Sequence, residues 1–168
     1  MEKTYSTYYA SPVGNLRISC NETCITEVHF FNRDQILTVN EPIAADAPPV
    51  LQQCLDELIE YFQGVRKTFD VPVQQDGTDF QQRVWNELLN IPFGKTISYL
   101  TLAKRLGDPK VIRAAASTNG KNNIAIIVPC HRVIGTNNDL IGYAGGLWRK
   151  KYLLELETKI VYGVQTLF

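Results

Sequence analysis

Apolar and polar residues alternate in the first part of the chain, as in strands with one buried face. Residues 5–9 are strand-like, and residues 11–14 have the Ser-Pro-Val-Gly composition of a turn. Beyond this turn every second residue on one face is apolar: Leu16, Ile18 and Cys20. Another strand is predicted at residues 25–31, so the chain begins with a hairpin and a small sheet.

Helical spacing replaces this alternation further along the chain. Residues 32–39 have an ambiguous pattern, and residues 42–49 are predicted to form a loop. Residues 50–62 then predict a helix that ends at Gly64. Its apolar stripe comprises Leu51, Leu55, Leu58, Ile59 and Phe62.

A domain boundary is predicted near the middle of the chain. Residues 69–73 are typical of a short strand, and residues 74–77 (Gln-Gln-Asp-Gly) are interpreted as a linker. The sequence therefore predicts an N-terminal domain of residues 1–75 and a C-terminal domain of residues 76–168.

The second domain begins with helical patterns. Thr78 and Gln81 have the spacing of a capping box, and Pro92 and Gly94 interrupt the helix that follows. The predicted buried face of this helix comprises Phe80, Val84, Trp85, Leu88 and Leu89. Ser98 is predicted to cap the next helix, whose inward residues are Leu102, Ala103 and Leu106.

A helix-turn-helix is predicted around Gly107 and Asp108, because two short helices meet there. Asp108 is the expected cap of the second helix, with Pro109 at its first position. This helix continues to about residue 119 and contains Lys110, Arg113 and the small residues 114–117. Small side chains allow close approach to a nucleic-acid groove, although the alanines could instead pack against another helix. A final amphipathic helix is predicted at residues 147–157.

Charge is distributed unevenly, although the net charge is zero. Residues 1–79 carry five basic and twelve acidic side chains, whereas residues 95–151 carry ten basic and two acidic ones. A strongly basic half indicates a surface for a polyanion such as nucleic acid. A solvated face without a partner is the alternative.

Composition narrows the class of protein further. The chain has 168 residues and 45% hydrophobic residues, enough for one domain or two small ones with a core. No apolar stretch approaches the roughly 20 residues of a membrane span, so no membrane partner is expected. The N-terminus lacks a basic-then-apolar signal pattern, which predicts a cytoplasmic location. Four cysteines are too few and too scattered for a disulfide framework.

The candidate reactive centre is the segment Pro129-Cys130-His131-Arg132-Val133. It follows the apolar run of residues 124–128, which predicts a buried strand. A thiolate is a strong nucleophile, and a neighbouring base is the usual means of generating it. Direct contact between adjacent side chains requires a turn at Cys130, or else a bridging water. An inert buried cysteine beside a core histidine is the alternative interpretation.

A histidine that accepts a proton works best when a carboxylate orients its other nitrogen. From the local sequence the candidate carboxylates are Asp139, Glu155 and Glu157. Arg132 is expected to add positive charge near the thiol.

The strings PCHRVIG and GYAGGLWRKKYLLELE resemble the signature of the O6-alkylguanine-DNA alkyltransferases, also called methylated-DNA–protein-cysteine methyltransferases. The stretch FQQRVWNELLNIPFGKTISYLTLAKRLGDPKVIRAAASTNGKNN is similar to the DNA-binding region of that family, and YASPVG matches its first domain more weakly. The resemblance covers most of the chain and is specific over residues 80–157. It implies an α/β protein, with a small ribonuclease-H-like N-terminal domain and an α-rich, winged-helix-like C-terminal domain that contains the helix-turn-helix.

The family's reaction is stoichiometric DNA repair. The resemblance implies that an alkyl group moves from guanine O6 in DNA to Cys130 and stays there, with O4-alkylthymine as a second candidate substrate. By the same resemblance, His131 is the base that acts through a water, Glu157 is the carboxylate that orients it, and Asn122 braces the nearby turn.

The resemblance also assigns residues to the DNA and the base. Tyr99 is expected to meet guanine N3 and to help rotate the phosphate, and Arg113 to fill the gap left by the flipped nucleotide. Lys110 and Ala114 are expected to lie beside them at the DNA. The expected pocket comprises Tyr99, Arg132, Val133, Tyr143 and Ala144.

The chain departs from the family pattern at a few positions. Asn123 stands where the family usually has proline, residues 114–116 are all alanine, and Ala144 stands where serine is frequent. Cys20, Cys24 and His29 could suggest a metal, but they do not align as a ligand set, so no metal and no cofactor are expected. The expected partner is double-stranded DNA that contains alkylated guanine, with no obligate protein partner.

Two other functions were considered. A non-catalytic alkyltransferase-like lesion-binding protein would lack the acceptor cysteine, which is present here. A thiol hydrolase that uses Cys130 and His131 would leave the helix-turn-helix and the basic half unexplained.

Overall fold

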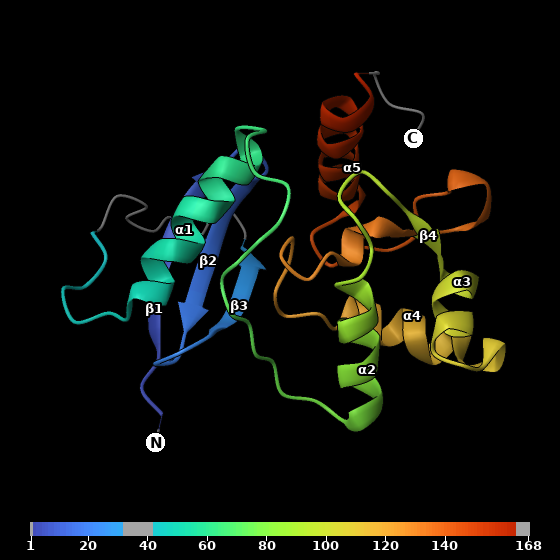
Figure 1. Ribbon diagram of the computed structural model, residues 1–168, viewed down its shortest axis with the longest axis horizontal. Coiled ribbons are helices and arrows are strands. Elements are labelled where there is room, and N and C mark those ends of the chain that lie inside the picture. Colours follow the sequence, from blue (N-terminus) through green and yellow to red (C-terminus); the bar gives the residue numbers. More distant parts are fainter. Residues whose placement is uncertain (1, 32–41, 164–168) are drawn as a thin grey trace. The chain divides into compact units, whose positions relative to one another are not determined.

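Two compact units make up the chain, Met1–Gln75 and Asp76–Phe168. The computed structural model describes residues 2–31 and 42–163 (Figure 1). The ambiguous residues 32–39 and the C-terminal residues 164–168 lie outside the described parts. The predicted mixed α/β architecture is confirmed, with a small sheet in the first unit and mostly helices in the second.

The first unit contains a three-stranded antiparallel sheet in the order β1-β2-β3. Its strands are β1 (Tyr5–Ser11), β2 (Gly14–Cys20) and β3 (Ile25–Phe30). The predicted turn joins β1 to β2, where the Ser11 hydroxyl accepts from Val13 N and donates to Gly14 O. Gly14 has a φ of 102°, a left-handed conformation that favours glycine.

Helix α1 (Pro49–Phe62) packs against this sheet (Figure 1). The predicted helix is confirmed, but its buried stripe is rotated toward Cys54, Glu57 and Tyr61, while Leu55 and Phe62 are only half-buried. The inward-facing residues of β2 are fully buried, as alternation predicted: Leu16, Ile18 and Cys20.

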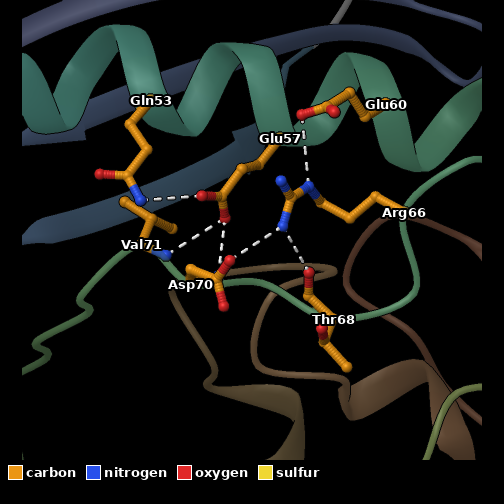
Figure 2. A network of polar contacts seen from close by, with 7 residues as sticks. All are labelled: Gln53, Glu57, Glu60, Arg66, Thr68, Asp70 and Val71. Carbon is orange, nitrogen blue, oxygen red and sulfur yellow. Dashed lines mark hydrogen bonds and ion pairs between the residues drawn. The ribbon is translucent and has the colours of Figure 1, made fainter.

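The predicted strand at residues 69–73 is wrong. Only Val73 forms a bridge, with Ile25, because Pro72 has no amide hydrogen. The amides of Asp70 and Val71 donate instead to the buried Glu57 carboxylate, at 2.8 and 3.1 Å (Figure 2). A side-chain acceptor on α1 therefore replaces a neighbouring strand in fixing this segment.

The second unit contains α2 (Asp79–Leu88), β4 (Ile97–Ser98), α3 (Tyr99–Arg105), the 3₁₀ turn η1 (Pro109–Val111), α4 (Ile112–Gly120), the 3₁₀ turn η2 (Cys130–Arg132), β5 (Val133–Ile134), the 3₁₀ turn η3 (Thr136–Asn138) and α5 (Leu147–Tyr162). Helices α2, α3 and α4 pack on one another. Trp85 Nε1 on α2 donates to Thr118 O on α4 at 3.2 Å. These contacts provide the core on which the helix-turn-helix is built.

The predicted caps are confirmed. Thr78 and Gln81 form the capping box of α2, and the Ser98 side chain accepts from Thr101 N at the start of α3. The Asp108 side chain caps the segment that follows it. The first residues of the predicted second helix form the 3₁₀ turn η1, and α4 begins after them. Leu89 was wrongly predicted to be buried: it lies at the C-cap of α2 and is 47% exposed.

The predicted strand at residues 124–128 is also wrong, although all of these residues are buried. The segment is a compact turn in which Ile126 has a φ of 72°. Asn122 Nδ2 donates to Ile124 O at 3.2 Å and to Val128 O at 2.8 Å, so the amide takes up carbonyls that a strand would offer to a neighbour. Burial was predictable from hydrophobicity, but the turn was not. Among the described residues, no helix has the length and apolar character of a membrane span.

Candidate active site

The segment around Cys130 is a turn held between two ordered pieces of backbone. Cys130 N donates to Val128 O at 2.8 Å, and β5 leaves the turn to pair in parallel with β4. Because η2 is a 3₁₀ turn, Cys130 and His131 are not forced onto opposite faces as they would be in a strand. The turn that contact between their side chains would require is therefore present.

Two asparagines support this turn. Asn119 Nδ2 on α4 donates to Cys130 O at 3.2 Å, and the Asn122 side chain hydrogen-bonds the Cys130 thiol. Sequence reasoning identified Asn122 but missed Asn119. The feature that could have identified Asn119 is its position one helical turn after Ala115, which places a polar residue on the buried side of α4.

His131 lies against one of the three candidate carboxylates. His131 Nε2 is 2.7 Å from Glu157 Oε2, and both side chains are almost fully buried. The other candidates point elsewhere: Glu155 pairs with Lys151 at 3.7 Å, and Asp139 is exposed. The structure thus pairs His131, one residue after Cys130 in the η2 turn, with Glu157.

The Glu157 carboxylate also receives donors from Arg132, the next residue of η2, and from the loop after α2. Arg132 Nε approaches Oε1 at 2.8 Å and a terminal nitrogen of Arg132 approaches Oε2 at 3.0 Å, while Gly94 N donates at 3.1 Å. Burial by itself would raise the pKa of Glu157, but the charges and hydrogen bonds of His131 and Arg132 hold it well below its usual range. Glu157 is therefore ionised at neutral pH.

His131 is neutral in this environment. Burial lowers the pKa of its imidazole, and the attraction of Glu157 offsets only part of that effect. Since an ionised carboxylate only accepts hydrogen bonds, we assign the proton to Nε2 and leave Nδ1 as an acceptor. Nδ1 is buried and meets no hydrogen-bond partner among the described residues, which leaves it free to take a proton.

The thiol itself is strongly affected by burial. Burial raises the pKa of Cys130, and the Asn122 hydrogen bond and the charge of Lys150 lower it by less. Arg132 does not supply the charge near the thiol that the sequence suggested, because its guanidinium is engaged with Glu157 and with Ile91 O. In the resting protein the sulfur is predominantly a thiol.

Lys150 is a second residue of this site that sequence reasoning missed. It lies on α5, seven residues before Glu157, and is fully buried. The signal was helical spacing: Lys150, Leu153, Leu154 and Glu157 form the buried stripe of α5. Lys150 was missed because lysine side chains usually face solvent.

The residues expected to meet DNA lie on the helix-turn-helix. Lys110 is on η1, and Arg113 and Ala114 are on α4, all three with exposed side chains. Ala115 is buried in the helical core, as packing against another helix requires, whereas Ala114 is exposed. Small exposed residues leave part of this helix open to close approach.

The expected pocket residues are distributed around the loop that follows β5. Tyr99 Oη at the start of α3 donates to Ile141 O at 2.9 Å in this loop. Tyr143 is half-buried, Ala144 is exposed, and Val133 is fully buried at the start of β5. Arg132 departs from the expectation, since its side chain braces Glu157 instead of facing a substrate.

A metal site does not emerge from the parts of the chain that the structure describes. No group of three or more potential ligands gathers there. Cys20 is buried in β2, and His29 on β3 is exposed.

Two family models together match nearly the whole chain. Residues 4–75 match the ribonuclease-like domain of 6-O-methylguanine DNA methyltransferase, and residues 79–159 match its DNA-binding domain. A methylated-DNA–protein-cysteine methyltransferase of Mycobacterium tuberculosis is 42% identical over 158 residues, covering 94% of each chain. The constitutive enzyme of Bacillus subtilis is 41% identical over 157 residues, covering 91% of this chain and 94% of its own.

Solved structures agree with the sequence matches. The crystal structure of Mycobacterium tuberculosis OGT in complex with DNA has a TM-score of 0.81 and 41% identity, and covers 92% of this chain and 93% of its own. A two-unit α/β protein with a buried cysteine-histidine-glutamate site beside a helix-turn-helix defines a DNA-binding thiol protein. The chain belongs to the methylated-DNA–protein-cysteine methyltransferase family.

The buried network predicts that acid destabilises the second unit. The pKa of His131 is lower in the folded state than its unfolded value of about 6.5, so below that pH the unfolded chain binds more protons. Glu157 adds to the loss as the pH falls through about 4, because its pKa is also lowered by folding. Urea unfolding followed by tryptophan fluorescence reports on this unit, since Trp85 and Trp148 both lie in it.

We expect the urea midpoint to fall steadily from pH 7 to pH 4, and a constant midpoint would contradict the network. Glu157→Gln should cost about 3 kcal/mol or more at pH 7, because it leaves the Arg132 charge buried and unpaired. Glu155→Gln, which removes a carboxylate from a surface pair on the same helix, is the matched control and should change little.

Proposed function

We propose that this chain repairs DNA by moving an alkyl group from guanine O6 to Cys130 Sγ, once per molecule. The observation that carries the proposal is the buried arrangement of thiol, neutral imidazole and ionised carboxylate in a member of this family. The sulfur–carbon bond forms as the oxygen–carbon bond breaks. The electron pair of the broken bond goes to the guanine, and the thiol proton goes to His131.

His131 is the proposed base. Its Nδ1 is an acceptor because Glu157 fixes the proton on Nε2, and a water between Nδ1 and the thiol would complete the path. Transfer of the proton creates an imidazolium beside the ionised Glu157, which stabilises it. The thiolate thus forms at the moment of reaction, while the resting sulfur stays protonated.

DNA is the proposed partner, bound through the basic helix-turn-helix. An O6 substituent is hidden inside a duplex, so the nucleotide must rotate out at a cost of roughly a few kcal/mol. Arg113 is exposed on α4 and is proposed to fill the vacated stack, with Lys110 at a phosphate and Ala114 allowing close approach. Tyr99 is proposed to contact guanine N3.

The proposed base pocket is formed by Val133, Tyr143, Ala144 and Tyr99, with Arg132 as a brace behind it. Its donors would stabilise the charge that develops on the departing guanine. O4-alkylthymine is a second candidate substrate. The reaction as proposed uses no metal or cofactor and no obligate protein partner, and the proposed location is the cytoplasm. The two compact units are proposed to act as the two domains, with the chemistry in the second.

Intact-mass spectrometry tests the reaction directly. After incubation with duplex DNA that contains O6-methylguanine, the protein should gain one methyl group, and peptide mapping should place it on Cys130. Cys130→Ala should gain nothing while it still binds DNA. Cys24→Ala removes the partly exposed cysteine of the first unit and should react normally. Methylation of Cys130→Ala, or methylation of wild type at another residue, would overturn the proposal.

Arg113→Ala tests the role of α4 in base rotation. We expect repair of duplex DNA to slow at least about tenfold, which corresponds to part of the cost of extruding a base. Reaction with free O6-benzylguanine should be nearly unchanged, because no duplex has to open. Arg105→Ala removes an exposed cation from the neighbouring helix α3 and controls for the general loss of charge. Equal slowing with both substrates would argue against the role.

A further inference from the structure

Lys150 is a lysine with no exposed surface, near the start of α5. Its Nζ donates to Val133 O at 2.7 Å, to Ile141 O at 3.1 Å and to Gly142 O at 3.2 Å. These carbonyls satisfy the three hydrogens of an ammonium group. They also join β5, which leaves the Cys130 turn, to the loop that contains the expected pocket wall.

Lys150 lacks a carboxylate partner within residues 2–31 and 42–163, where no ion pair includes it. Glu157 lies on the same face of α5, but its oxygens are engaged by His131 and Arg132. Carbonyl dipoles compensate only part of a full buried charge. The group whose ionised form would complement this charge is the Cys130 thiol.

We propose that Lys150 is a positioning residue of the alkyl-acceptor site: it fixes the loop at Ile141 and Gly142 to β5, and from there its charge favours the thiolate form of Cys130. The inference rests on the proposed function, in which that thiolate attacks the alkyl group. It adds a residue that acts through the sulfur without touching the substrate.

The Lys150 charge acts on both groups that exchange the proton. Burial is the largest influence on the pKa of both Cys130 and His131, and the Lys150 charge lowers each of them. A cation here therefore favours the thiolate and keeps the resting His131 in the neutral form that can accept a proton, while it disfavours the imidazolium that the transfer produces. The titratable groups that face it are Cys130 and His131 on η2 and the Tyr99 ring on α3, at 5.7 Å.

Lys150 and Tyr99 also donate hydrogen bonds to the same backbone oxygen. Ile141 O accepts from both Lys150 Nζ and Tyr99 Oη. The start of α3, the loop and α5 are thereby tied together at a single carbonyl. The charge that favours the thiolate is held in place by the same contacts that fix the loop.

The charge of Lys150 is itself dependent on pH. Burial lowers the pKa of Lys150 to about 8. Its influence on the sulfur should therefore be present near pH 7 and fade as the pH rises well above 8. A lysine that acts only through packing would show no such change.

The test is the rate at which iodoacetamide alkylates Cys130, located by peptide mapping, from pH 6 to pH 9.5. At pH 7, Lys150→Met should react about tenfold more slowly than wild type, the effect of removing a nearby opposite charge. The ratio should approach one above pH 9. Lys150→Gln retains a donor for the carbonyls but has no charge, and it should behave like Lys150→Met.

Lys151→Met is the matched control, because Lys151 is the exposed neighbour on the same helix. It should react at the wild-type rate. A wild-type rate in Lys150→Gln, a ratio that is constant with pH, a faster reaction in Lys150→Met, or an equal loss in Lys151→Met would each overturn the proposal.

Wild-type protein supplies a readout if neither variant folds, as judged by circular dichroism. The logarithm of its rate should rise by one per pH unit up to about 7.5 and then more slowly as Lys150 loses its proton, since Lys150 has a pKa of about 8. A slope of one that continues to pH 9 would contradict the inference. Iodoacetamide needs no DNA, so failure here is distinct from failure of methyl transfer to Cys130, which would sink the proposed function.

Discussion

The second unit depends on one buried carboxylate. Glu157, at 1% exposure, accepts from His131 and Arg132 in η2 and from Gly94 N in the loop after α2, two segments that are far apart in the sequence. An ionised group with so little exposure is stable only when donors surround it. The same contacts hold the loop after α2 and the η2 turn against α5, and they fix the tautomer of the imidazole. Fold and chemistry therefore rest on the same ion pair.

The reactivity of Cys130 depends on ionisation of its thiol. Burial keeps the pKa of the Cys130 thiol above its ordinary value, although Asn122 and Lys150 favour the charged form. A protein whose acceptor is consumed by one reaction benefits from a sulfur that reacts slowly with other electrophiles in water. The neutral His131 can accept the thiol proton, and the charge of Lys150 favours the thiolate.

Much of the fold followed from local sequence signals. The Thr78, Ser98 and Asp108 caps formed as predicted, because a cap depends on a few neighbouring residues. Alternation correctly identified β1, β2 and β3. The two wrongly predicted strands are segments whose backbone hydrogen-bonds a side chain instead of a neighbouring strand. Glu57 provides that side chain for Asp70 and Val71, and Asn122 provides it for the turn before Pro129.

Some residues of the candidate site were predicted from the sequence and others were not. Cys130 and His131 stood out as a motif, and the resemblance selected Glu157 from three carboxylates. Charge near the thiol was assigned to the neighbour in sequence, Arg132, whereas the neighbour in space is Lys150. Residue type misleads here, because nothing local distinguishes a buried lysine from the exposed Lys151 beside it. Only the position of Lys150 on the same helix face as Glu157 could have revealed it.

The most direct test of this account is the tautomer of His131 at pH 7, measured by nitrogen NMR on histidine-labelled protein. His29→Gln isolates the signals, since the chain has only two histidines. We expect a neutral ring with the proton on Nε2, toward Glu157, and no proton on Nδ1. An imidazolium, or a neutral ring protonated on Nδ1, would contradict it, because neither form could take the proton from Cys130 through that nitrogen.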